Sequence, residues 1–218
     1  MSVIKFNSYH QKEEMKRNLK LINLKYEKIR DYVDFHIFSF EELDDCQTGF
    51  SIDPDGNSLV TGEDGSWDNN WIVIGYETIC GDPIIIELNE DGYPVSQLIH
   101  GMGSWDAGSF LTDSIESFIE ILKDIECFLT EKQVLQGKRT IQNKELKALL
   151  NNIIEKDKFT DFEIWQSLLN PLFDIADEYE KELETKVKEM KEEGKKITEI
   201  AYLLNIKPKD VYEYIKKM

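Results

Sequence analysis

Side chains that could act as nucleophiles or general bases are sparse in this sequence. Of its three histidines, only His100 lies in the segment from 71 to 122, where strand and turn signals are densest. Ser104 and Ser109 follow it closely, but the G-x-S-x-G pattern of a nucleophile elbow is absent. We therefore interpret His100 as a structural imidazole, and the sequence shows no pattern typical of nucleophilic catalysis.

Two carboxylates of the same segment have the residue types of a general acid and a general base. Asp82 and Glu87 are five positions apart on one apolar run, so a strand places them on opposite faces of a sheet. Such an arrangement does not suit a shared active site. The sequence therefore predicts a protein that is not an enzyme and that needs no cofactor.

The loop from 53 to 64 partly matches a calcium-binding loop. Four of its residues occupy the ligand positions 1, 3, 5 and 12, namely Asp53, Asp55, Asn57 and Asp64. Position 6 is Ser58 instead of glycine, position 12 is Asp instead of a bidentate Glu, and the flanks have strand character. A β-hairpin turn is therefore the favoured interpretation, with strands over 50–52 and 58–61. A metal site at 53–64 is the alternative.

Cysteine usage and apolar runs bear on the compartment. Cys46, Cys80 and Cys127 are far apart, and no paired Cys or His spacing typical of zinc occurs, so we expect reduced thiols. No apolar run approaches the roughly 18 to 20 residues of a membrane span. The N-terminal residues also lack the apolar region of a signal peptide. We expect a cytoplasmic protein.

The net charge of −17 is concentrated in one part of the 218 residues. Residues 46–130 carry sixteen acidic residues and a single basic one, Lys123, whereas the segments on either side are each close to neutral. A strongly acidic surface repels nucleic acids and membranes, attracts basic proteins and accelerates their association. The alternative is that the charge only maintains solubility.

Hydrophobic periodicity predicts a mixed fold. Apolar residues at three- and four-residue spacing predict a helix over 12–34, and a capping box at 39–42 predicts a short helix from residue 40. A further amphipathic helix begins near Asp113. Runs rich in β-branched residues or bounded by turn signals predict strands over 71–76, 83–88, 94–100 and 109–112.

Strand signals stop beyond residue 130. Helices are predicted over 143–156 and over 171–192. Between them, a capping sequence at 160–163 predicts a helix that ends at Leu169. The last stretch, 197–216, fits a helix-turn-helix template, with Asn205 at the turn. One interpretation is a DNA-binding unit; the other is a helical hairpin that packs on helix 171–192 or on a partner. DNA binding is disfavoured because the stretch lacks Arg and carries Asp210 and Glu213 on its second helix.

The order of short motifs between 67 and 122 resembles the SUKH superfamily. The matching features are a Trp-Ile-Val-Ile-Gly strand, a Gly-Asp-Pro before an apolar strand, Pro-Val, His-Gly, a tryptophan and a helix with Ser and Phe. The residues that carry them are Trp71, Gly75, Gly81, Asp82, Pro83, His100, Gly101, Trp105, Ser114 and Phe118. The Leu-Pro and Asn-Gly-Gly motifs usual near the start of the family are missing, and residues 131–218 lie outside the pattern.

This resemblance implies an α+β domain over 1–130, with a curled, mostly antiparallel sheet flanked by helices. The helical signals beyond residue 130 add an all-helical extension over 131–218, which lies outside the pattern. The superfamily includes cell-wall-assembly regulators and bacterial immunity proteins that block a toxin, often a nuclease. Together with the charge, it predicts an immunity protein that binds a basic toxin. We expect the contacts to come from acidic residues and exposed aromatics: Asp53, Asp55, Glu63, Asp64, Trp67, Asp68 and Trp105.

Overall fold

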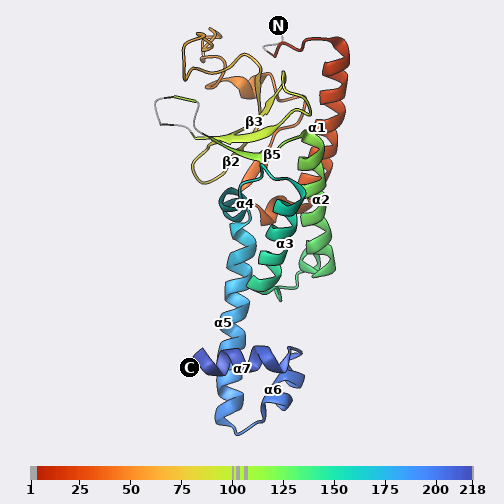
Figure 1. Ribbon diagram of the computed structural model, residues 1–218, viewed down its shortest axis with the longest axis vertical. Coiled ribbons are helices and arrows are strands. Elements are labelled where there is room, and N and C mark those ends of the chain that lie inside the picture. The colour runs from red at the N-terminus through yellow and green to blue at the C-terminus, as the bar shows by residue number, and fades with distance from the viewer. Residues whose placement is uncertain (1–3, 100, 102–103, 106–107, 218) are drawn as a thin grey trace.

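Figure 1 shows the computed structural model, which describes residues 4–99, 101, 104–105 and 108–217. The described residues form one antiparallel sheet, whose five strands lie side by side in chain order, together with α-helices. The expected α+β fold is confirmed. The strands are β1 (Phe35–Ile37), β2 (Trp71–Glu77), β3 (Pro83–Glu87), β4 (Val95–Leu98) and β5 (Gly108–Thr112).

Helices occupy most of the chain outside the sheet. They are α1 (Tyr9–Ile29), α2 (Ile115–Glu131), α3 (Asn143–Lys156), α4 (Phe162–Leu168), α5 (Asn170–Glu192), α6 (Ile197–Leu204) and α7 (Pro208–Lys217). None of the described helices has the length and apolar character that crossing a membrane requires.

The centre of the sheet is the pair β2 and β3. Val73 lies opposite Ile85, and the register shifts between Val73 and Gly75, which marks an irregularity in β2. A Cβ atom at Gly75 would lie 2.0 Å from the carbonyl oxygen of His36 on β1. Only glycine therefore allows β1 and β2 to approach this closely.

Strand β1 is absent from the strands that the sequence predicts, and the helix predicted over 12–34 ends earlier than expected. Helix α1 ends at Ile29, and a 3₁₀ turn, Arg30–Tyr32, leads into the strand. Phe35 and Ile37 are buried and His36 is half-buried. Three residues are too few for alternation to stand out in a sequence, so β1 is defined by its pairing with β2.

The short helix expected from residue 40 is also corrected. The Ser39 hydroxyl does donate to the Glu42 carboxylate, at 2.6 Å, but the chain forms turns and then a 3₁₀ turn, Asp45–Gln47. The buried Gln47 side chain donates to the carbonyls of Leu43 and Val73 and accepts from the Val73 amide. These bonds hold the segment against β2 and compete with a regular helix.

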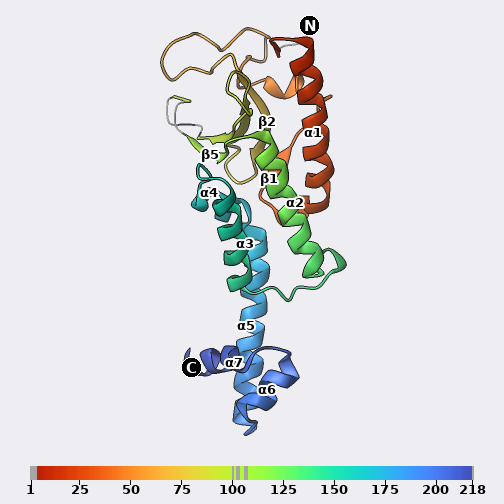
Figure 2. The same cartoon turned by 45° about the vertical axis from the view of Figure 1, so that its right-hand side comes forward.

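One face of the sheet is covered by α1 and α2, which lie together on that side (Figure 2). Their apolar stripes meet the buried side chains of the strands in one cluster, to which α1 contributes Met15, Leu19, Ile22, Tyr26 and Ile29. Each fully buried Leu, Ile or Phe side chain stabilises the fold by roughly 1.5–3 kcal/mol. This cluster is the main core.

The main core continues beyond residue 130. Trp165 of α4 is fully buried, its ring lies 6.1 Å from Phe118 of α2, and its indole Nε1 donates to the carbonyl of Leu111 at 3.0 Å. Residues of α3 and of the first half of α5 belong to the same cluster. The boundary expected at residue 130 therefore does not coincide with a break in the core.

A second, separate cluster lies at the other end of α5. Helix α5 runs away from the sheet and carries α6 and α7 at its far end (Figure 1). The cluster consists of Leu183, Val187, Ile200, Ala201, Val211 and Tyr214. The hairpin of α6 and α7 thus packs on α5, and we call residues 183–217 the terminal three-helix unit.

Candidate functional site

The other face of the sheet is covered by loops. Residues 48–70, together with Gly101, Ser104 and Trp105, form a layer over β2, β3 and β4 that we call the loop layer. In Figure 2 residues 48–70 lie on the side of the sheet opposite α1. The hairpin strands expected at 50–52 and 58–61 are not formed, because Ile52 and Ser58 make only an isolated bridge.

Trp67 anchors the loop layer to the sheet. It is only 1% exposed and belongs to a cluster with Val73, Ile85 and Leu98. The expectation that Trp67 is an exposed contact residue is therefore wrong. The apolar outer face of the sheet needs a cover, and a large indole buries that face efficiently. Its Nε1 has no hydrogen-bond partner among the described residues.

Three other aromatic rings surround this anchor. The ring of Trp67 lies 5.1 Å from Trp105, 5.5 Å from Phe50 and 5.5 Å from Trp71. Trp105 and Phe50 are half-buried, and their rings are 6.1 Å apart. Phe50 was not among the predicted contact residues. The sequence predicts a hairpin strand at Phe50. The one local signal for an irregular loop is the neighbouring glycine, Gly49, which adopts a φ of +93° in the structure.

Two segments of the loop layer are joined at Gly65. The amide of Trp105 donates to the Gly65 carbonyl at 2.8 Å, and Gly65 has a φ of +78°. A Cβ atom at Gly65 would lie 2.5 Å from the Cβ of Ser104. A larger residue would therefore separate the two segments and disturb the position of Trp105.

The predicted acidic residues lie on the surface of this layer. Four are exposed, namely Asp55, Glu63, Asp64 and Asp68, and Asp53 is half-buried. No ion pair to any of the five is found within the described ranges. The sequence contains no Lys or Arg between residues 31 and 122, so cations are also distant along the chain. The layer presents negative charge that nearby side chains do not neutralise.

Asp53 has a local structural role. Its carboxylate accepts hydrogen bonds from the Asn57 side chain at 2.9 Å and from the Asn57 backbone N–H at 2.8 Å, and both lower the pKa of Asp53. These bonds stabilise the turn and engage the oxygens that a calcium ion would need. Groups of three or more side chains able to hold a metal are not found in the part of the chain that the structure describes.

Further carboxylates extend the acidic surface along β3. Burial raises the pKa of Glu87, and the nearby charges of Glu90 and Asp68 raise it further. The carboxylates of Glu90 and Asp68 thus repel the ionised Glu87 in the free protein. A cationic partner would relieve this repulsion.

The loop layer contains two adjoining hollows that share Gly65, Ser66 and Trp67. The first has a volume of about 380 Å³, and its other walls include Phe50, Leu59 and Trp105. We call it the aromatic hollow. The second, the acidic hollow, has a volume of about 440 Å³, and Glu63, Asp64 and Asp68 contribute to its lining.

Several residues that carry the SUKH resemblance allow close packing, form a turn, cap a helix or lie in the main core. Gly75 allows the close approach of β1, as described above, and Gly81 takes a φ of +80° in the turn before β3. Ser114 caps α2 by accepting from the Ser117 amide, and Phe118 lies in the main core.

The remaining residues of this pattern lie around β2 and the loop layer. Asp82 is buried and Pro83 begins β3. Trp71 is half-buried at the start of β2, and Gly101 is exposed with a φ of +80°. His100 lies outside the described residues.

The terminal three-helix unit forms a second candidate surface. Asn205 has a φ of 52° between α6 and α7, as the helix-turn-helix template requires. Lys209, Tyr212 and Lys216 of α7 are exposed. Asp210 instead forms an ion pair of 2.8 Å with Lys144 of α3, beside a cleft of about 930 Å³.

Comparison of the chain with protein-family models, curated proteins and solved structures found no match. Membership of the SUKH superfamily therefore stays a prediction from the motifs.

Proposed function

We propose that this chain is a SUKH-type immunity protein that binds a basic protein toxin and blocks it stoichiometrically, without catalysis. The observation that carries this proposal is the loop layer, where carboxylates lie on the surface with no ion pairs among the described residues. The three cysteines are free thiols, which supports action in the reducing cytoplasm.

A nuclease is the toxin class that best fits such a surface. Nucleases expose basic clefts that bind the phosphate backbone, and an acidic surface can occupy such a cleft in place of the nucleic acid. Opposite charges also accelerate association, which suits a protein that must capture a toxin before it acts. Neutralisation then follows from occlusion of the cleft.

The test is equilibrium binding to a basic protein toxin encoded beside the gene, which is the partner that the proposal requires. We would change four exposed carboxylates to amides and leave Asp53 intact because it holds its turn: Asp55→Asn, Glu63→Gln, Asp64→Asn and Asp68→Asn. Because the four substitutions remove charges that face the toxin, we expect the variant to bind the toxin roughly 30-fold or more weakly at physiological salt. Calorimetry measures the affinity and the stoichiometry together.

The matched control changes four exposed glutamates outside the loop layer: Glu13→Gln, Glu155→Gln, Glu192→Gln and Glu213→Gln. Both variants change the net charge from −17 to −13, so they differ only in the position of the charge. The control should bind within about threefold of the natural chain. Equal losses in the two variants would refute binding through the loop layer, and no binding of the toxin by the natural chain would refute the immunity function.

A second candidate function is supported by the terminal three-helix unit. We propose as the alternative a regulator that uses α7 to bind DNA or a partner helix. The supporting observations are the left-handed Asn205 turn, the separate core and the exposed Lys209 and Lys216. Salt-sensitive binding of duplex DNA by the whole chain would favour this alternative.

A further inference from the structure

The aromatic hollow has walls of a kind that binds cations. Trp105 and Phe50 line it and are half-buried, and Leu59, which also lines it, is 40% exposed. The faces of indole and phenyl rings carry negative electrostatic potential and attract cations. The acidic hollow adjoins it through Gly65, Ser66 and Trp67.

We propose that the aromatic hollow binds one arginine side chain of the basic partner. Its guanidinium stacks on Trp105 and Phe50, and the carboxylates of the acidic hollow, among them Asp64, attract its charge. This inference rests on the proposed function, because it assigns the anchoring point of the same basic partner.

The shape and surroundings of the hollow favour arginine over other occupants. A guanidinium is planar, stacks on aromatic faces and is more weakly hydrated than the ammonium group of lysine, so it enters a hollow with apolar walls at a lower cost. Its methylene stem can cover Leu59. An apolar side chain would leave the neighbouring carboxylates uncompensated, and the same surface of a second copy would bring equal negative charge.

The direct test uses the whole chain and a tripeptide, Ac-Gly-Arg-Gly-NH₂. Titration is followed by the indole N–H resonances of the four tryptophans in two-dimensional NMR, assigned by single Trp→Phe variants. We expect saturable shifts of the Trp105 and Trp67 signals. Trp165 is the internal reference, because its indole is buried in the main core and bonded to Leu111.

The control peptide replaces arginine by citrulline, which has nearly the same shape but no charge. We expect citrulline to bind at least about tenfold more weakly. Equal binding of the two peptides, or no saturable shift of Trp105 with the arginine peptide, would overturn the proposal.

Variants locate the site. Trp105→Leu keeps an apolar side chain but removes the aromatic face, and should weaken the arginine peptide by roughly tenfold. Asp64→Asn should weaken it by about threefold. Phe159→Leu, at an exposed aromatic residue on the segment between α3 and α4, should change nothing. An unshifted Trp165 signal shows that each variant is folded, and unchanged peptide affinity in a folded Trp105→Leu chain would refute the site.

The outcome is separable from that of the proposed function. If the neighbouring toxin binds through the loop layer but the arginine peptide does not bind, the arginine site is refuted and the immunity function stands. If the peptide binds as expected and the toxin does not, the immunity function is refuted, but the conclusion that the aromatic hollow binds an arginine side chain stands.

Discussion

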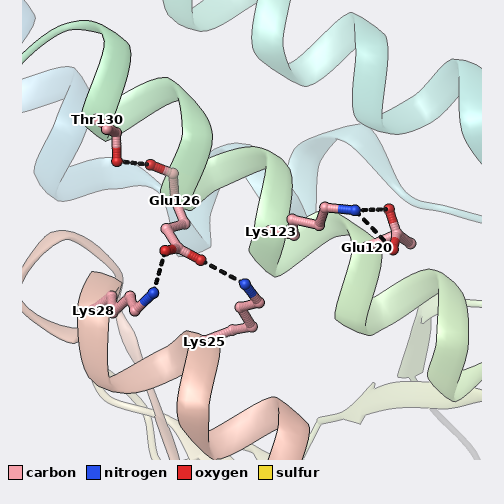
Figure 3. A network of polar contacts seen from close by, with 6 residues as sticks. All are labelled: Lys25, Lys28, Glu120, Lys123, Glu126 and Thr130. Atoms are coloured by element: carbon pink, nitrogen blue, oxygen red, sulfur yellow. Dashed lines mark hydrogen bonds and ion pairs between the residues drawn. The ribbon is translucent and has the colours of Figure 1, made fainter.

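Glu126 is the residue that joins α1 and α2 electrostatically. Its carboxylate accepts from Lys25 at 2.9 Å and also from Lys28, and its side chain is 15% exposed (Figure 3). Hydrogen bonds from Lys25 and then Lys28 lower the pKa of Glu126. A depressed pKa in the folded state means that this carboxylate stabilises the fold above its unfolded pKa, and that the contribution is lost as the pH falls through the folded pKa.

We predict that Glu126→Gln lowers the free energy of unfolding by about 1 kcal/mol at pH 7, after allowance for the exposure of Lys28. The difference from the natural chain should shrink below about pH 4.5 and vanish once the carboxylate is protonated. Urea unfolding at a series of pH values measures it.

The neighbouring pair Glu120–Lys123 supplies the control, since both side chains are about half exposed, at 53% and 50% (Figure 3). Glu120→Gln should change stability by less than about 0.5 kcal/mol at any pH. A loss at Glu126 that does not depend on pH would show that packing, not charge, is responsible.

At the scale of elements, the terminal three-helix unit has a small core that is separate from the main core. Its cluster has six buried apolar residues, whereas the main core joins the sheet to α1, α2, α3, α4 and part of α5. A small core has little reserve against the loss of one side chain. Local opening of α6 and α7 therefore needs less free energy than global unfolding.

We predict that Ile200→Ala, at a side chain with 0% exposure, destabilises the unit by roughly 2–5 kcal/mol. Amide hydrogen exchange should accelerate in α6 and α7 and stay unchanged in β2 and β3. The matched control is Leu203→Ala, because Leu203 is 51% exposed on the same helix. Equal acceleration in the sheet would contradict the separation of the two cores.

At the scale of the whole molecule, the acidic and the lysine-rich parts lie at opposite ends. The acidic loop layer lies at one end, and the terminal three-helix unit lies at the other (Figure 1). In the sequence, residues 194–218 carry six lysines against three acids. Residues 1–193 therefore carry −20. This field opposes the approach of DNA to the terminal unit.

The immunity proposal thus predicts no shift of duplex DNA by the whole chain in a mobility assay at physiological salt. A salt-sensitive shift that is lost in the Lys209→Gln, Lys216→Gln double variant would favour the regulator instead. The double variant also controls for binding through the rest of the chain.

The sequence by itself determined the properties that depend on residues close to one another along the chain. Periodic apolar residues located α2, α3 and α5, dense Ile and Val runs located β2 and β3, and Asn205 marked the turn before α7. The charge segregation was also readable, because it is a property of composition.

Contacts between distant segments decided the rest. Which tryptophan anchors the loop layer depends on how residues 48–70 fold back over β2 and β3, so Trp67 is buried and Trp105 is half-buried. Strand β1 exists because β2 pairs with it, and Trp165 extends the core past residue 130 because it meets Phe118. Local patterns carry little information about such packing, since burial arises only when the whole chain is assembled.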